Sequence, residues 1–134
     1  MAKYESIHRG WRLVGIHRIY FRSKWEANYA FYLEYLSNQR IIAGWLHEPR
    51  TFWFAGIKRG CVSYLPDFQV LNYDGSHHWV EVKGYMDAKS KTKIKRFRKY
   101  FPEEELIVAD AKWFRANANT QTIIPGWILQ SGRS

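Results

Sequence analysis

Cysteine, acidic side chains and long apolar runs are scarce in this chain of 134 residues. The single cysteine, Cys61, excludes an internal disulfide and fits a reducing compartment such as the cytoplasm. No run of about 18 apolar residues and no signal-peptide core follows Met1, so we expect neither a membrane span nor a membrane partner. Spaced zinc-ligand pairs and a glycine-rich phosphate loop are also missing, which argues against both kinds of site.

Positive charge and aromatic side chains are present in excess. The sequence has 21 Lys and Arg against 12 Asp and Glu, for a formal charge of +9, together with 7 Trp, 9 Tyr and 8 Phe. Such a charge favours a polyanionic partner, with nucleic acid preferred over a membrane surface. The length is that of one domain with one ordinary core. The aromatic residues supply much of that core and, we expect, stacking surfaces as well.

The hydrophobic pattern predicts a single domain in three parts: a basic lead-in at residues 1–22, a core at about 23–127 and a tail at 128–134. The lead-in leaves three interpretations open, which are an ordered arm, a short strand and a tail that touches DNA. No internal repeat or low-complexity linker interrupts the core.

Within that core, apolar stripes with helical spacing predict helices at about 23–37 and 87–100, and a short helix is expected near 111–117. Residues 44–54 and 106–109 read as strands, and Pro49 in the first implies an edge position or a bulge. Because a helix separates residues 78–83 from 106–109, these two strands should run parallel.

A β-hairpin is predicted between the two helices. Apolar runs up to Leu71 and from Trp79 to Val82 flank a turn-forming stretch at 72–76. A three-residue loop at Tyr73 to Gly75, with Gly75 in the left-handed conformation, is a common solution for such a stretch. That register places Asp67 directly opposite Glu81, with Cβ atoms about 4.5–5.5 Å apart.

This pairing predicts a metal site. Two carboxylates about 4 Å apart repel by roughly 4 kcal/mol at an effective dielectric near 20, and a divalent cation is the natural counter-charge. Lys83 lies two residues beyond Glu81 on the same strand face and adds a fixed positive charge. The alternatives that involve no metal are a turn at Pro66-Asp67 and a cross-strand surface pair at Glu81 and Lys83.

Glu26 has two interpretations. Ser23-x-x-Glu26 fits the capping box, in which the glutamate returns to the N–H of the capping residue. Glu26 also lies at the edge of the helical apolar stripe, beside Leu33, where its carboxylate could reach a cation held at the strand ends. Glu34 lies farther from that boundary and is expected to be solvated.

The helix predicted at 87–100 carries seven cations in eleven residues with no acid between them. They are Lys89, Lys91, Lys93, Lys95, Arg96, Arg98 and Lys99. Such a run can be an ordinary solvated face. Like charges four residues apart destabilise an isolated helix, however, so an external anion such as the phosphate backbone of DNA would account for the pattern.

These residues together resemble a known family. Glu26, Pro66-Asp67 and Glu81-x-Lys83 are similar to the signature of the PD-(D/E)XK nuclease superfamily. The longer strings Ser23-Lys24-Trp25-Glu26, Tyr64-Leu65-Pro66-Asp67-Phe68 and Val80-Glu81-Val82-Lys83-Gly84-Tyr85 resemble small phage-encoded members that are similar to archaeal-type Holliday junction resolvases. The likeness covers residues 23 to about 110. It implies an α/β fold with a restriction-endonuclease-like core, in which helices flank a mixed central sheet of an antiparallel meander and one parallel strand.

The resemblance also implies roles for the site residues. Asp67 and Glu81 would bind Mg²⁺ or Mn²⁺, the carbonyl of Val82 would be a further ligand, and Glu26 would bind directly or through water. Lys83 would orient or deprotonate the attacking water and stabilise the phosphorane.

The function expected from residues and resemblance together is Mg²⁺-dependent endonuclease activity on branched DNA, with resolution of Holliday junctions as the first expectation. Two symmetric nicks make a homodimer the simplest assembly. The place of action would be the cytoplasm, of a host bacterium if the chain is phage-encoded. Two alternatives stay open: another enzyme of the superfamily, such as a restriction, repair or nicking endonuclease, and a non-catalytic DNA-binding module.

Overall fold

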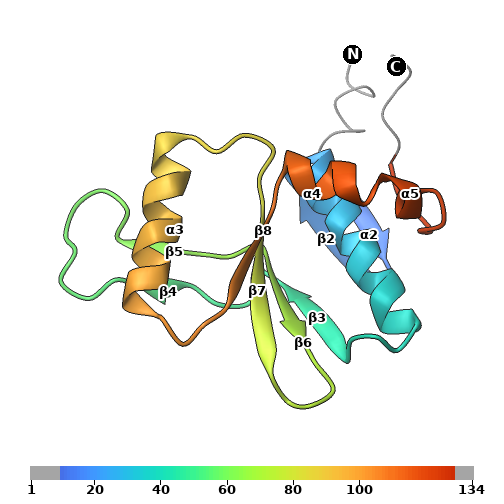
Figure 1. Cartoon of the computed structure of the whole chain (residues 1–134), viewed down its shortest axis with the longest axis horizontal. Coiled ribbons are helices and arrows are strands. Elements are labelled where there is room, and N and C mark those ends of the chain that lie inside the picture. Colours follow the sequence, from blue (N-terminus) through green and yellow to red (C-terminus); the bar gives the residue numbers. More distant parts are fainter. Residues whose placement is uncertain (1–9, 129–134) are drawn as a thin grey trace.

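The computed structural model describes residues 10–128, so the predicted features at residues 1–9 and 129–134 lie outside the described part. The fold is mixed α/β (Figure 1). Its central sheet has the strand order β3-β6-β7-β8, with β3 (Gly44–His47), β6 (Phe68–Leu71), β7 (His77–Val82) and β8 (Leu106–Ala109). β3, β6 and β7 pair antiparallel, although β4 and β5 lie between β3 and β6 in the chain, and β8 runs parallel to β7. The predicted mixed sheet and its parallel strand are therefore confirmed.

The predicted hairpin register is confirmed as well. Phe68 pairs with Val80, and the Asn72 N–H donates to the Ser76 carbonyl at 2.9 Å. Gly75 closes the loop with a φ of +90°, a conformation that a side chain would strain. Asp67 is one position beyond the Phe68 pair and thus opposite Glu81. Asp67 itself lies just before the first residue of β6.

The single strand predicted at 44–54 is wrong. The chain leaves the sheet after His47, because Glu48 adopts a left-handed φ of +48° and Pro49 follows it. A second strand, β4 (Phe52–Trp53), then pairs with β5 (Ser63–Tyr64) in a separate two-stranded ribbon.

The described part of the basic lead-in is a β-hairpin. The strands β1 (Gly10–Val14) and β2 (His17–Phe21) pair antiparallel and bury Val14 and Phe21. Their turn packs closely on the first helix, since a Cβ at Gly15 would lie 2.5 Å from the Glu34 carboxylate. Of the three interpretations left open for this segment, the structure supports the strand for its described residues.

The two long helices begin one residue after the predicted starts at about 23 and 87. Ser23 caps α2 (Lys24–Asn38), and Asp87 caps α3 (Ala88–Tyr100). Two short helices, α4 (Ala111–Ala116) and α5 (Ala118–Gln121), follow β8. Among these described helices, none combines the length and the apolar character needed to cross a bilayer.

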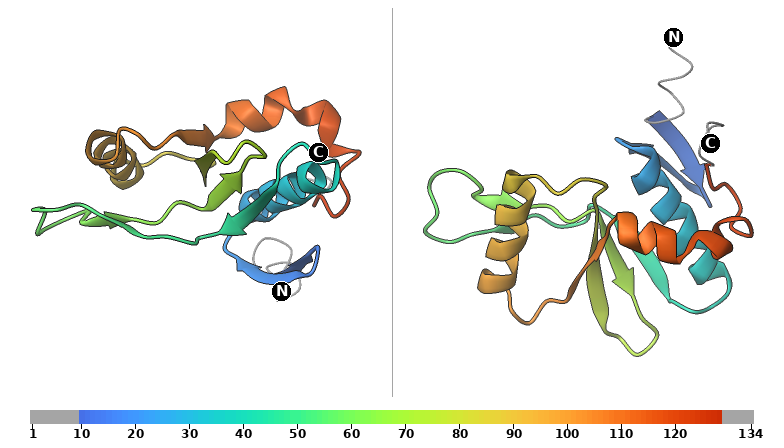
Figure 2. Two further views of the ribbon diagram at one scale, coloured as in Figure 1. Left: turned by 90° about the horizontal axis from the view of Figure 1, so that it is seen from below. Right: turned by 45° about the horizontal axis from the view of Figure 1, so that its top comes forward.

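Two hydrophobic clusters pack on opposite faces of the sheet. Val80 joins the cluster made with α2, β1, β2 and α4, whereas its neighbour Trp79 joins the cluster made with β4, β5 and α3. Figures 1 and 2 show these two groups of elements on either side of the central strands. Asn28 fastens Ile128 to the first group through two hydrogen bonds of 2.9 and 2.7 Å, so the first residue of the predicted tail is still attached to the fold.

Candidate functional site

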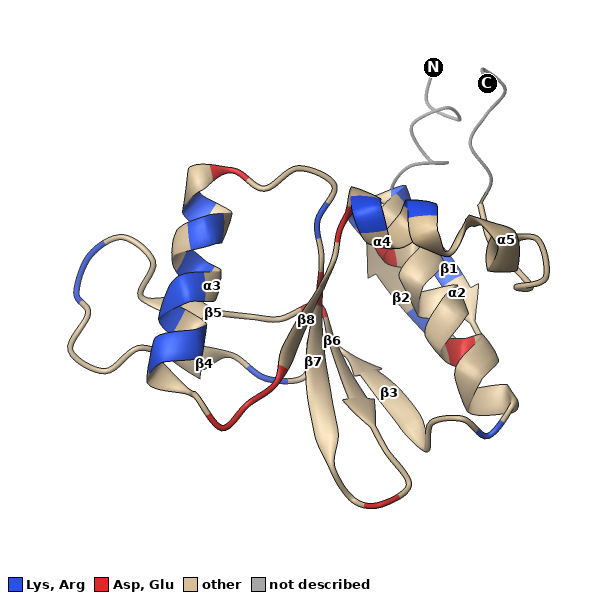
Figure 3. Cartoon of the chain, viewed as in Figure 1, with Lys and Arg blue, Asp and Glu red and all other residues tan. Residues whose placement is uncertain are grey.

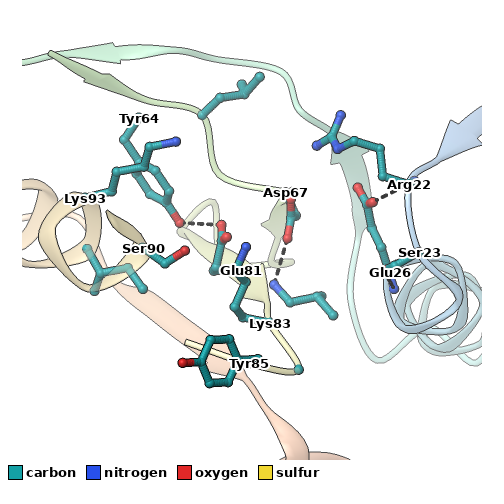
Figure 4. Close-up of a pocket in the computed structure, with 14 residues that line it drawn as sticks. Arg22, Ser23, Glu26, Tyr64, Asp67, Glu81, Lys83, Tyr85, Ser90 and Lys93 are labelled. Atoms are coloured by element: carbon teal, nitrogen blue, oxygen red, sulfur yellow. Dashed lines mark hydrogen bonds between the residues drawn. The ribbon is translucent and has the colours of Figure 1, made fainter. Parts of the chain in front are cut away.

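A pocket of about 550 Å³ opens between α2, α3 and the two inner strands of the sheet, at the start of β6 and the end of β7 (Figure 4). All the predicted site residues on α2 and the hairpin line it, and α3 contributes further residues. The lining comprises Arg22, Ser23, Glu26, Tyr64, Leu65, Asp67, Glu81, Val82, Lys83, Gly84, Tyr85, Ser90, Lys93 and Ile94.

Asp67 is fixed in the pocket through both its side chain and its backbone. Its side chain is buried, and Oδ2 accepts the Val82 N–H at 2.7 Å. Its own carbonyl accepts the Glu48 N–H at 2.8 Å. Burial, with the charges of Glu81 and Glu26 acting in the same direction, raises the pKa of Asp67 to about 8. A carboxylate in this state favours a proton or a cation.

Glu81, on β7, is held by a residue of β5 in the separate ribbon. The Tyr64 hydroxyl donates to Glu81 Oε1 at 2.6 Å. Burial raises the pKa of Glu81, although the Tyr64 hydrogen bond and the charges of Lys83 and Lys93 act against that rise. Burial and the neighbouring Glu81 in turn raise the pKa of the Tyr64 hydroxyl, which keeps it a proton donor.

Glu26 reaches the same pocket from α2, and its side chain combines parts of both earlier interpretations. The Glu26 N–H donates to Ser23 Oγ at 3.1 Å, as a helix cap requires. Its carboxylate Oε1 accepts the N–H of Arg22, one residue before the cap, at 3.3 Å. The other oxygen, Oε2, lies 2.6 Å from Nε2 of His47. Glu26 is therefore buried and fixed at the helix–sheet boundary.

His47 and Glu48 are site residues that the sequence reasoning missed. Ligand atoms of Glu26, His47 and Glu48 lie within 4.8 Å of one another, and Glu48 Oε2 is 2.5 Å from Nη2 of Arg22. No local motif marks them, since both fall in a stretch that reads as a continuous strand. A group of this kind can hold a metal ion. In this arrangement its members are paired with each other and with Arg22.

The cations of α3 differ in what they contact. Lys93 lines the pocket, whereas Arg96 donates to the carbonyl of Cys61 at 2.7 Å and Arg98 to that of Leu106 at 3.1 Å. The other lysines of the run are exposed: Lys89, Lys91, Lys95 and Lys99. Figure 3 shows the basic residues along α3. The predicted phosphate-binding set thus includes one arginine, Arg96, that also ties α3 to a loop.

The pocket brings the predicted carboxylates together. Figure 4 shows Asp67 and Glu81 projecting into one space, with Lys83 near Glu81 and Glu26 on the other side of Asp67. Buried carboxylates whose pKa values rise through burial and mutual repulsion are oxygen donors suited to a hard divalent cation. Glu34, which was predicted to be solvated, is half-buried, and its Oε1 accepts Trp45 Nε1–H at 3.0 Å.

Fold and site together define a basic mixed α/β domain with a carboxylate-lined pocket at the ends of its inner strands. The chain belongs to the family described as "Protein of unknown function (DUF1064)", whose model matches residues 3–115. Neither a curated protein nor a solved structure matches the chain.

Proposed function

We propose that this protein is a divalent-metal-dependent endonuclease that hydrolyses phosphodiester bonds in branched DNA, such as four-way junctions. The observation that carries the proposal is the convergence of Asp67, Glu81 and Glu26 with Lys83 in one pocket. Three acids and one ammonium in a buried setting match the needs of metal-assisted phosphoryl transfer to water. Glu26 comes from α2, Asp67 precedes β6 and Glu81 lies on β7, so a surface pair of Glu81 and Lys83 alone does not explain the arrangement.

The arrangement of elements supports the same proposal. A helix with an inward carboxylate, three antiparallel strands, a second helix and a parallel strand follow in the order that the PD-(D/E)XK superfamily resemblance implies, with the β4–β5 ribbon inserted after the first strand. In this proposal the domain has the restriction-endonuclease-like core, and the DUF1064 chain is a small resolvase-like member of that superfamily.

The residues have separate roles in the proposed reaction. Asp67 and Glu81 hold Mg²⁺ or Mn²⁺, with Glu26 and the carbonyl of Val82 as further ligands. The bound ion would supply charge neutralisation at the scissile phosphate and activation of water. Lys83 orients that water and offers positive charge as the phosphate becomes more anionic. Tyr64, by donating to Glu81, fixes the direction of one ligand oxygen.

DNA binding is proposed for the exposed side of α3. Its lysines add positive charge near a pocket that Lys93 already lines. Phosphate contacts would hold a duplex arm there without reading its sequence. Branch selectivity then depends on how several arms reach one pocket.

The test is a cleavage panel with linear, nicked, flap and four-way DNA, each with and without Mg²⁺. We expect Mg²⁺-dependent cleavage with a preference for branched substrates. Lys83→Ala and Asp67→Asn should bind the same DNA and lose roughly 10²–10³ in rate. Lys112→Ala, an exposed lysine on α4, is the matched control and should cut normally.

The outcomes separate the alternatives. Equal cleavage of all substrates would favour a restriction, repair or nicking enzyme of the same superfamily. Binding without any metal-dependent cleavage would favour a non-catalytic DNA-binding module. Wild-type rates in Lys83→Ala or Asp67→Asn would remove the proposed site.

A further inference from the structure

The β1–β2 hairpin exposes aromatic and basic side chains on its outward face. Alternation sends Val14 and Phe21 inward, and leaves Trp11, Leu13 and Tyr20 outward with exposed fractions of 56%, 67% and 41%. Trp11 and Tyr20 are directly paired across the strands, with ring centroids 5.6 Å apart. Large apolar side chains gathered on one face usually mark an interaction surface.

A cation belongs to the same face. The Arg18 guanidinium lies over the Trp11 ring at 4.6 Å from its centroid, and Arg18 is itself exposed. An arginine beside exposed rings can stack on a flat partner and also pair with a phosphate. The face therefore offers ring surfaces and positive charge within one small area.

The charge of the segment favours a nucleic acid over a second copy of this chain. No Asp or Glu occurs between residues 6 and 25, so no acidic residue of this segment offsets the charge of Arg18 on the outward face. A two-fold contact between two such hairpins would bring like charges together. A polyanion would be complementary in charge.

We infer that the outward face of β1–β2 is a stacking surface for unpaired bases of a nucleic-acid strand. Trp11 and Tyr20 contact the bases, and Arg18 contacts the adjoining phosphate. Base stacking on aromatic rings tolerates any sequence because every base has a flat face. The inference adds a binding surface to the proposed nuclease. Only the cleavage of the bound strand rests on the proposed function; the binding itself does not.

The position of the hairpin suits this role. Arg22, which lines the pocket, follows Tyr20 by two residues, or about 7 Å of extended chain. A strand stacked on the hairpin therefore passes close to the pocket rim. Junctions, flaps and gaps have unpaired or easily opened bases next to the duplex, whereas continuous duplexes do not. The hairpin thus selects substrates that carry a single-stranded stretch beside the cleavage position.

The experiment measures binding of a short fluorescent oligothymidylate, and of a fully paired duplex, by anisotropy in EDTA. Trp11→Thr and Tyr20→Thr keep strand-forming residues on the hairpin and remove one ring each. Trp53→Thr and Tyr73→Thr are the matched controls, since those rings are also exposed, at 66% and 64%, but lie elsewhere. Thermal melting checks the folding of every variant.

Each hairpin variant should weaken single-strand binding about five- to hundredfold, which is the usual worth of one stacked ring, and change duplex binding little. The two controls should bind like the wild type. Trp11→Phe, which keeps a ring, should restore most of the affinity and guards against a folding defect in Trp11→Thr.

Unchanged oligothymidylate affinity in Trp11→Thr and Tyr20→Thr, or an equal loss in the controls, would overturn the inference. So would sedimentation data in which Trp11→Thr dissociates a wild-type dimer without altering DNA affinity, because a second copy would then cover this face. The assay contains no divalent metal, so its result is independent of the proposed cleavage. Ring-dependent binding without Mg²⁺-dependent cutting would remove the nuclease and keep the stacking surface.

Discussion

Asp67 makes the stability of the metal-free protein depend on pH. Its pKa rises from an ordinary 3.8 to about 8 in the folded state, chiefly through burial. Between about pH 4 and pH 8 the folded state then binds more protons than the unfolded state, so stability falls as pH rises. The slope contributed by one such group is at most about 1.4 kcal/mol per pH unit.

Asp67→Asn should therefore differ from wild type in a pH-dependent way in EDTA. Asparagine keeps an acceptor for the Val82 N–H but carries no charge, so the variant should melt at a higher temperature than wild type near pH 8 and match it only near pH 4, where the aspartate is protonated in both states. Melting curves across that range are the measurement. Glu103→Gln, at an exposed position, should behave like wild type. Parallel curves for wild type and Asp67→Asn would contradict the prediction.

His47 is predicted to position Glu26 for metal binding. Its ring packs between Phe21 and Phe68, with centroids 5.1 and 5.3 Å away, and its Nε2 is 2.6 Å from Glu26. Removing such a partner of a ligand typically lowers metal affinity or activity by about 10- to 100-fold. His47→Gln should therefore weaken Mn²⁺ binding, measured by calorimetry, by a factor in that range.

A second histidine–glutamate pair provides the control for His47. His77 lies 2.9 Å from Glu104, on the hairpin strand but outside the pocket. His77→Gln should bind Mn²⁺ as the wild type does. Equal affinities in both variants would show that Glu26 holds its place without His47.

At the scale of elements, α3 is predicted to supply phosphate contacts through its exposed lysines. Reversing Lys91, Lys95 and Lys99 to Glu leaves the arginines that bind backbone carbonyls in place. DNA affinity should fall, and the slope of log K against log salt should flatten by about 0.9 for each phosphate that a lysine no longer neutralises. Titrations at several salt concentrations measure both.

A matched reversal separates local contacts from net charge. Lys58 and Arg59 are exposed in the β4–β5 loop and Lys112 is exposed on α4, and changing them to Glu alters the total charge by the same amount. That variant should lose affinity only modestly and keep most of its slope. Identical slopes in the two triple variants would show that the lysines of α3 are solvated and do not contact phosphates.

Elements set by local signals could be predicted from the sequence. Ser23 and Asp87 cap α2 and α3 where their positions predict, and the loop ending at Gly75 fixes the hairpin register. Pro49 indicates an edge position or a bulge, but the full break of the strand after His47 is not predicted. It depends on the Glu48 N–H bonding to the Asp67 carbonyl and on the pairing of β4 with β5, which are contacts between distant parts of the chain.

The site residues also fall into two groups, those set by local signals and those set by contacts between distant parts of the chain. Asp67, Glu81 and Lys83 follow from register and strand alternation, so the sequence sufficed to place them on one face. The contact of His47 with Glu26 spans 21 residues, and that of Glu48 with Arg22 spans 26. Such pairs join a strand, a helix cap and the segment after β2, and only the packing of these elements creates them.

At the scale of the whole molecule, the pocket joins the two hydrophobic clusters. Arg22 and Glu26 approach it from the cluster around α2, whereas Tyr64 and Lys93 belong to elements of the cluster around α3. One chain therefore completes one such pocket. Resolving a four-way junction takes two nicks on symmetric strands, so a two-fold dimer is the simplest assembly that the proposed function requires.

This requirement predicts a mixing effect. Wild type mixed with excess Lys83→Ala should form dimers with one working pocket. On a plasmid with an extruded cruciform, such dimers make one nick and release the junction before a second. Nicked circles should therefore increase at the expense of linear product, as measured on agarose gels. Mixing with Lys112→Ala should leave the ratio of nicked to linear product unchanged. If Lys83→Ala only lowers the total rate at a constant ratio, the two nicks come from independent monomers and the dimer is not needed.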